Sequence, residues 1–193
     1  MKQPSRLLAL VALGAGLALS ARAAVETYVP DPAHSTVGFN IRHFFTKVPG
    51  TFTKYTATIK VDRENLEKST AEATIDIGSV STGQPKRDTH LQQPEFFDAA
   101  KFPTMTFKSK SWKKIDDKNY DVTGDLTIKG VTKEVVLKVT ALGFGPGPMP
   151  GSQISGWEGA TKLNRHDFGV SAFKGVVGDD VEITINVEAG LKK

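Results

Sequence analysis

Alternation of apolar and polar residues runs through most of the chain and constrains its fold more than any other feature. In the segment TVGFNIR, residues 36–42, Val37, Phe39 and Ile41 fall on one face of an extended chain, with a polar residue or glycine at the positions between. Successive side chains of a strand point to opposite faces, so such a run predicts a strand with one buried face. Turn residues separate eight such runs. The predicted strands lie within residues 34–43, 54–62, 69–77, 103–111, 120–130, 133–143, 155–163 and 179–189.

Eight strands with one apolar face each predict an all-β domain, either a closed antiparallel barrel or a sandwich. Several positions on the predicted inner face carry small residues, namely Ala57, Ala71, Ala73, Gly124, Ala141 and Gly159. In an eight-stranded barrel, small inner residues leave room for a ligand unless large neighbours fill the space. Phe39, Phe107 and Trp157 are large enough to do so. A ligand cavity and a dry core are both consistent with this pattern.

The first 23 residues have the features of a secretory signal peptide. Lys2 and Arg6 precede an uncharged apolar run of about 13 residues, and Ala21-Arg22-Ala23 resembles a cleavage site. The run is shorter than the roughly 20 residues that span a bilayer as a helix, which disfavours the alternative of a membrane anchor. We therefore expect export to the periplasm and one mature domain, residues 24–193, without a stable membrane span.

Composition excludes several kinds of site. Three of the 25 basic residues and no acidic residue lie in residues 1–23, so the net charge falls from +4 to +1 after cleavage. We expect no nucleic-acid partner, because binding nucleic acid requires a basic face. The chain has no cysteine, which rules out disulfides, a thiol nucleophile and a thiolate metal site.

Residues 83–98, here called the insert, interrupt the strand pattern. Pro85 is suited to a first helical turn, which would place Arg87, His90 and Leu91 on one side of a short helix. We expect the insert to cover an open barrel end, with Phe96 and Phe97 pointing inward and charged groups at the rim. Alternatively, Arg87, Asp88 and His90 pair only with one another and brace the connection.

Sequence patterns for catalysis are weak. There is no His-Glu-x-x-His and no Gly-x-Ser-x-Gly motif, and we predict no metal, no cofactor and no enzymatic activity. We interpret the Asp-Phe-Gly of residues 167–169 as the junction between a strand and a turn, where Gly169 gives the backbone the freedom that the turn needs. A less favoured alternative is a lipid-acting hydrolase with a histidine as general base beside an aspartate. The candidate bases are His34, His90 and His166, near Asp31, Asp88 and Asp167.

Six sequence blocks, spread in order over the mature chain, resemble the YceI-like family of exported polyisoprenoid-binding proteins. The long block from Arg87 through Phe96-Phe97 to Pro103 is the most specific of them. One departure is TKVPG, residues 46–50, which we take as a loop. The blocks are DPAHSTVGFNIRH (31–43), PGTF (49–52), SVSTGQPKRDTHL (79–91), EFFDAAKFPTMTF (95–107), GDLTIKGVTKEVVL (124–137) and NRHDFGV (164–170).

The resemblance implies an extended lipocalin-like barrel of eight antiparallel strands with an apolar channel. It also implies an isoprenoid or fatty amphiphile as ligand, held for transport, storage or sequestration, and it implies no catalytic residue. Arg87, Asp88 and His90 are then candidate head-group or rim residues. A partner-binding module of an envelope complex is the alternative function, and a homodimer is possible. The expected tail-channel residues are Val37, Phe39, Ile41, Tyr55, Ala57, Ile59, Ala73, Ile75, Phe96, Phe97, Met105, Phe107, Leu126 and Trp157.

Overall fold

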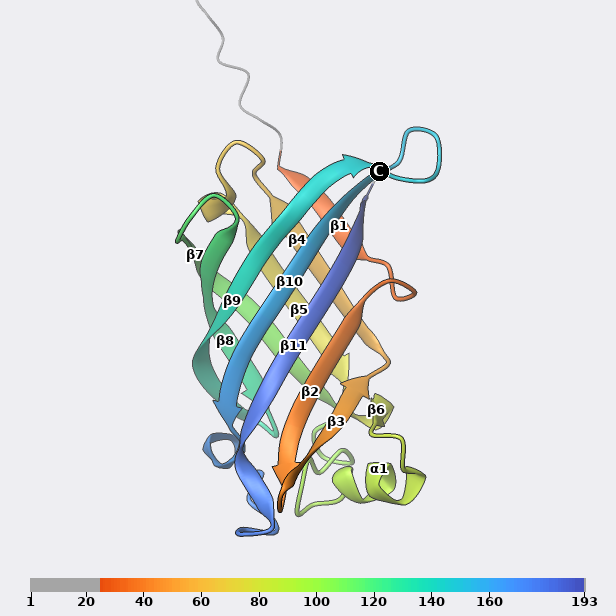
Figure 1. The fold of residues 1–193 in the computed structure, drawn as a ribbon, viewed down its shortest axis with the longest axis vertical. Helices are drawn as coiled ribbons and strands as arrows, with labels where there is room; N and C mark the ends of the chain where they lie inside the picture. Colours follow the sequence, from red (N-terminus) through yellow and green to blue (C-terminus); the bar gives the residue numbers. More distant parts are fainter. Residues whose placement is uncertain (1–24, 193) are drawn as a thin grey trace, which may run out of the picture.

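The predicted eight-stranded antiparallel barrel is confirmed. A computed structural model describes residues 25–192, and the predicted signal peptide lies outside these residues. The sheet closes where Tyr28 of the first strand pairs with Leu191 of the last (Figure 1). Around the ring the order is β1 (Glu26–Pro30), β4 (Tyr55–Val61), β5 (Thr70–Asp76), β7 (Thr104–Lys114), β8 (Asn119–Ile128), β9 (Val131–Pro146), β10 (Gln153–Asn164) and β11 (Val177–Leu191).

Three of the eight strand positions are interrupted, which adds three shorter strands to the sheet. β2 (Thr36–His43) continues the line of β1, because β11 pairs with β1 near its end and with β2 over residues 177–186. β3 (Thr46–Phe52) pairs with β2 and leads into β4, and β6 (Val80–Ser81) pairs with the end of β3. Within residues 25–192, the eight-stranded circuit therefore contains eleven strands.

The loop expected at residues 46–50 is wrong, since these residues belong to β3. Pro49 lies opposite Asn40 of β2, and β6 pairs only with Thr51 and Phe52. Pro49 therefore lies in a part of β3 that pairs with β2 on one side only. Proline is tolerated there, because no strand on the other side needs its N–H as a hydrogen-bond donor.

Large side chains fill the end of the barrel that contains β1, here called the filled half. Its core includes Tyr28, Val61, Trp112 and Trp157, each 5% exposed or less. The small inner residues leave no free volume at Gly124, because a Cβ there would lie 2.5–2.6 Å from the Phe107 ring. In this half of the barrel the dry-core alternative holds.

The insert contains one helix, as predicted. α1 (Pro85–Leu91) starts with proline. A proline at the first helical position breaks no hydrogen bond, because an N–H at that position has no acceptor within the helix. The described part of the chain also has three short 3₁₀ helices, η1 (Leu66–Lys68), η2 (Ile77–Ser79) and η3 (Arg165–Phe168). The insert returns through turns and lies at the barrel end opposite the filled half (Figure 1). No helix within residues 25–192 is long and apolar enough to cross a membrane.

Candidate ligand-binding cavity

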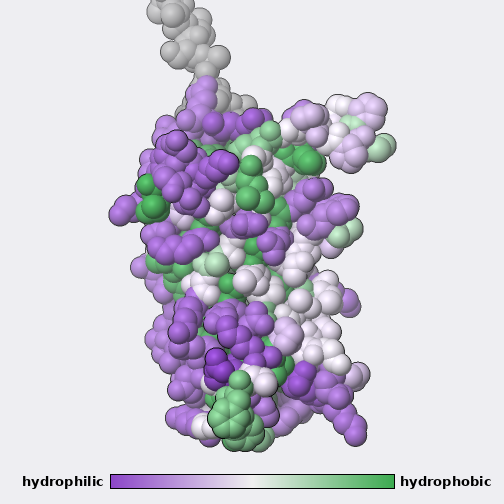
Figure 2. Space-filling view, in the orientation of Figure 1, coloured by the Kyte–Doolittle hydropathy of each residue, from purple (hydrophilic) through white to green (hydrophobic). Residues whose placement is uncertain are grey.

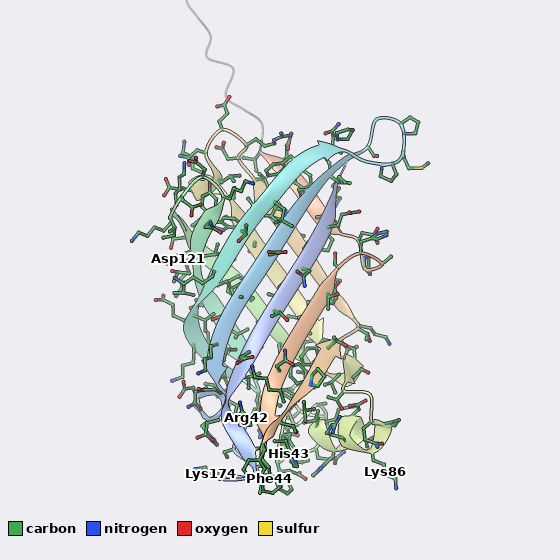
Figure 3. The ribbon with its side chains drawn as sticks, in the orientation of Figure 1. Arg42, His43, Phe44, Lys86, Asp121 and Lys174 are labelled. Atoms are coloured by element: carbon green, nitrogen blue, oxygen red, sulfur yellow. The ribbon has the colours of Figure 1, made fainter. Side chains whose placement is uncertain are left out.

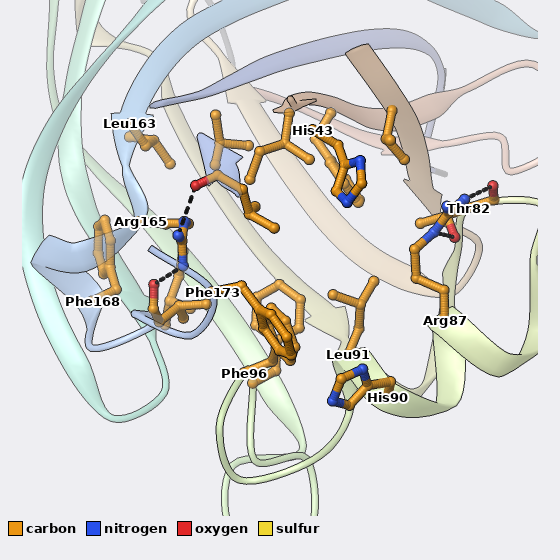
Figure 4. A pocket seen from close by; sticks show the side chains of 18 of the residues that line it. His43, Thr82, Arg87, His90, Leu91, Phe96, Leu163, Arg165, Phe168 and Phe173 are labelled. Atoms are coloured by element: carbon orange, nitrogen blue, oxygen red, sulfur yellow. Dashed lines mark hydrogen bonds between the residues drawn. The ribbon is translucent and has the colours of Figure 1, made fainter. Parts of the chain in front are cut away.

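A cavity of about 320 Å³ occupies the barrel end next to the insert, here called the cavity half (Figure 4). Its volume is at the lower end of the range of small-molecule sites. Its wall is apolar except for five residues, which are His43, Thr82, Arg87, His90 and Arg165. The apolar residues come from β2, β3, β7, β8, β10, β11, the insert, η3 and the loop after η3: Phe39, Ile41, Val48, Phe52, Leu91, Phe96, Phe97, Met105, Ile128, Leu163, Phe168, Val170, Phe173, Val176, Val177, Val181 and Ile183.

The structure brings five predicted tail residues together around this cavity: Phe39, Ile41, Phe96, Phe97 and Met105. Phe96 is buried and Phe97 is half-buried, so the insert turns its aromatic pair inward as expected. Alternation in β2 places Phe39 and Ile41 on the inner face, whereas the inward direction of Phe96 and Phe97 depends on how the insert folds back.

The other nine predicted tail residues do not line the cavity. Ile59, Phe107 and Trp157 belong to the core of the filled half, and Ala73 and Leu126 pack against it. Val37, Tyr55 and Ile75 belong to a second cluster around Phe52 and Met105, which backs the cavity. Ala57 lies opposite Ala73 in the β4–β5 pair. Contact between these nine residues and a ligand stays a prediction.

The predicted rim residues brace the insert through partners other than one another. Arg87 donates from Nε to Thr82 Oγ1 at 2.7 Å and from Nη2 to the Thr82 carbonyl oxygen at 2.8 Å. Asp88 accepts a hydrogen bond from the Thr82 N–H at 2.9 Å, and His90 Nε2 lies 2.8 Å from Glu95 Oε1. Arg87 and His90 also line the cavity, whereas Asp88 does not. Bracing and ligand contact are therefore compatible for Arg87 and His90.

Arg165 is a cavity residue that the sequence did not reveal. It is 5% exposed, and its guanidinium donates to four backbone carbonyls, those of Val170, Ala172, Val177 and Gly178, at 2.8–3.1 Å. Burial lowers the pKa of Arg165. The sequence could not predict this role, because the partners of Arg165 are backbone carbonyls, which every residue has. The only available signal was a charged residue next to a predicted turn. The expected turn itself is confirmed, since Gly169 has a φ of 71°.

The ionisable residues of the cavity wall are all basic. They are His43, Arg87, His90 and Arg165, and no aspartate or glutamate is among the lining residues. A low-dielectric wall of this kind favours a hydrogen-bond acceptor or an anion over a cation.

The histidine–carboxylate pairs do not converge on a reaction centre. His34 Nδ1 lies 2.8 Å from Asp31 Oδ2 on the exposed turn between β1 and β2. His166 pairs with Asp179 rather than Asp167, and His90 pairs with Glu95 rather than Asp88. Of the three candidate bases, His90 is the one that lines the cavity.

One surface cluster has the side chains that a metal ion would need. Ligand atoms of Asp31, His34 and Glu188 all lie within 4.8 Å of one another. Asp31 and His34 already satisfy each other by a hydrogen bond, which raises the pKa of His34 and lowers that of Asp31. The prediction of a metal-free protein stays a prediction.

A closed antiparallel barrel with an apolar cavity at one end defines a lipocalin-like fold. The YceI-like domain matches residues 28–189, and the chain belongs to this family. It is 37% identical over 161 residues to the protein YceI of Salmonella arizonae, with 83% of each chain covered.

Solved structures share the fold. The Burkholderia cenocepacia protein BcnA superimposes with a TM-score of 0.75 at 28% identity, covering 82% of this chain and 98% of BcnA. A polyisoprenoid binding domain from Saccharophagus degradans superimposes with a TM-score of 0.64 at 13% identity, covering 88% of this chain and all of that domain. At that identity the second similarity concerns the fold alone.

Proposed function

We propose that this protein is an exported carrier that holds the tail of a long-chain amphiphile, a polyisoprenoid or a similar lipid, in the cavity half. The observation that carries the proposal is the apolar, partly aromatic cavity wall with no acidic residue. The ligand class is part of the proposal, and it is the class named for the polyisoprenoid binding domain from Saccharophagus degradans, a protein of the same fold. Transport, storage or sequestration in the periplasm would each use this binding step.

The tail should dominate the affinity. Each buried CH₂ group contributes roughly 0.8 kcal/mol, so about ten buried carbons offer roughly 8 kcal/mol before ordering costs. A solvent-exposed charge pair with the head group adds roughly 0–1 kcal/mol. The protein should therefore select long apolar tails and distinguish head groups only weakly.

The head group is best accommodated beside the insert. The Arg87 and His90 side chains are both exposed and both border the cavity, so a polar group there keeps contact with water. Arg165 is buried and donates to four carbonyls, so it stabilises the loop after η3 and contributes mainly positive potential. An acidic head group beside Arg87 matches this potential.

Two β11 variants test the proposal against a matched control. Ile183 lines the cavity, while Ile185 lies two residues further along the same strand face and does not. Ile183→Phe should fill tail volume and sharply weaken binding of a neutral and of a pyrophosphate isoprenoid, whereas Ile185→Phe should keep both affinities. Over-packing costs typically 1–3 kcal/mol, so thermal unfolding must first show that both variants are folded. Normal binding by a folded Ile183→Phe protein would contradict a tail in this cavity.

A further inference from the structure

Three phenylalanines are exposed at the cavity half. Phe45 is 93% exposed, Phe44 is 55% exposed and Phe173 is 52% exposed. Phe44 and Phe45 form the turn between β2 and β3, and Phe173 lies in the loop after η3. Figure 2 shows apolar side chains projecting at the end of the molecule where Figure 3 places Phe44. Here these three residues are called the aromatic tip.

The backbone of the aromatic tip is poorly suited to phenylalanine. Phe44 has a φ of 47° and Phe173 a φ of 56°, in the left-handed region that bulky residues rarely adopt. Two-residue hairpin turns with positive φ usually carry glycine, asparagine or aspartate. Such strain is retained mainly at functional sites. Folding alone gives no reason for an aromatic side chain at Phe45, which projects into solvent. Phe44 packs edge-on against the His43 ring and still leaves half of its surface exposed.

Hydrogen bonds join the two loops of the tip at the cavity wall. The Phe44 N–H donates to the Val176 carbonyl at 2.9 Å, and the Val176 N–H donates to the Phe173 carbonyl at 3.1 Å. Phe173 stacks on Phe96 with ring centroids 5.8 Å apart, and both residues line the cavity. Phe173 therefore belongs both to the exposed tip and to the cavity wall, which makes the apolar surface continuous from outside to inside.

Basic side chains flank the aromatic tip. Arg42 donates to the Phe45 carbonyl at 3.2 Å, and Lys174 follows Phe173 in the chain (Figure 3). Within residues 25–192, ion pairs at this end use Lys47, His90, Lys162 and His166, and none involves Arg42 or Lys174. The nearby carboxylates of Glu182 and Asp179 interact with Arg42 and Lys174 only at longer range. Aromatic side chains next to lysine or arginine are typical of segments that lie in the interface of an anionic bilayer.

We propose that the aromatic tip inserts into the interfacial region of an anionic phospholipid bilayer, with Arg42 and Lys174 facing lipid phosphates. A convex pair of loop tips fits a deformable lipid surface. This orientation turns the cavity half toward the membrane and gives an apolar tail a continuous path from bilayer to cavity. The inference extends beyond ligand binding, because docking requires no lipid in the cavity.

Vesicle flotation tests the proposal with the purified, delipidated protein and vesicles of phosphatidylethanolamine and phosphatidylglycerol. The test variant is Phe44→Asn with Phe45→Ser, since asparagine tolerates positive φ. The matched control is Leu142→Asn with Met149→Ser, which removes exposed apolar side chains from β9 and the β9–β10 loop. We expect wild type and control to float with vesicles and the tip variant to lose at least about tenfold in partitioning, given the transfer energy of phenylalanine. Relief of the positive φ at Phe44 should leave its melting temperature equal or higher.

Three outcomes would overturn the proposal. Wild-type protein that stays with the aqueous fraction would do so, as would a folded tip variant that floats like wild type. Concentration-dependent dimers that the tip variant abolishes, seen by sedimentation velocity without vesicle binding, would instead assign the tip to a second copy of the chain. Isoprenoid binding measured in detergent reports separately on the proposed carrier function, so failure of one proposal is distinguishable from failure of the other.

Discussion

At the scale of single residues, Arg87 combines a structural contact with a place at the cavity. Its two hydrogen bonds to Thr82 are worth about 0.5–1.5 kcal/mol each at most, because water replaces part of them at an exposed site. We predict that Arg87→Ala lowers the melting temperature by about 2–4 °C. It should also narrow the difference in affinity between a pyrophosphate and a neutral isoprenoid, while neutral-lipid affinity stays within about tenfold. Calorimetric unfolding and titration with both lipids measure this, and equal loss of both lipids by folded protein would show that Arg87 does not act on the head group.

His34 gives a prediction about pH. Its hydrogen bond to Asp31 raises the pKa of His34 above the usual 6.5 and, together with the Ala33 N–H, lowers the pKa of Asp31 below 3.8. The folded protein therefore binds the His34 proton more tightly than the unfolded chain does, so this contribution to stability is complete below pH 6.5 and is lost as pH rises through the raised pKa. The Asp31 contribution is present above pH 3.8 and is lost as pH falls through the lowered pKa. A His34→Gln variant should lack the decline above pH 6.5, and an NMR titration of His34 at or below 6.5 would contradict the pairing.

At the scale of elements, the β2–β3 pair shapes the cavity through one glycine. Gly50 lies opposite Phe39, and a Cβ on Gly50 would overlap the Phe39 ring. Gly50→Ala should push this ring into the cavity and weaken lipid binding several-fold. Adding Phe39→Leu should recover part of the loss, with a coupling of about 0.5 kcal/mol or more in a double-mutant cycle. Additive effects of the two changes on lipid affinity would show that the ring does not move into the cavity.

The strand pattern predicted much of the fold, and its failures have physical reasons. Period-two alternation located a strand at each of the eight positions around the barrel, but at the first position it found β2 and missed β1. The proline in Gln84-Pro85 marked the start of the short helix. β3 was not predicted, because Pro49 and Gly50 are typical of a turn. Both residues are tolerated in β3 because this part of the strand lies at an edge of the sheet. The strand pattern did not predict the division into a filled half and a cavity half, because this division depends on which large side chains extend across the barrel interior. Phe107 covers Gly124, and no local pattern specifies that contact.

At the scale of the whole molecule, Ala73 marks the boundary between the two halves of the barrel. It packs against the core of the filled half and against the cluster that backs the cavity. The filled half leaves no room beyond this boundary, so a tail that reaches Ala73 has to end there, and Ala73→Leu should reduce binding of isoprenoids long enough to reach it while shorter ones bind as in wild type. Affinities across a series of chain lengths measure this effect, with unfolding checked for the expected cost of about 1–3 kcal/mol. A uniform loss at every length would place the boundary elsewhere.

Native mass spectrometry tests the central claim, that the barrel carries a long-chain amphiphile, most directly. The protein should be purified from its own cells without detergent exchange, beside the Ile183→Phe and Ile185→Phe variants. The account predicts an added mass that fragments as a long-chain lipid in wild type and in Ile185→Phe, and a strongly reduced adduct in folded Ile183→Phe. A lipid-free wild-type protein that also fails to take up added isoprenoids would contradict it.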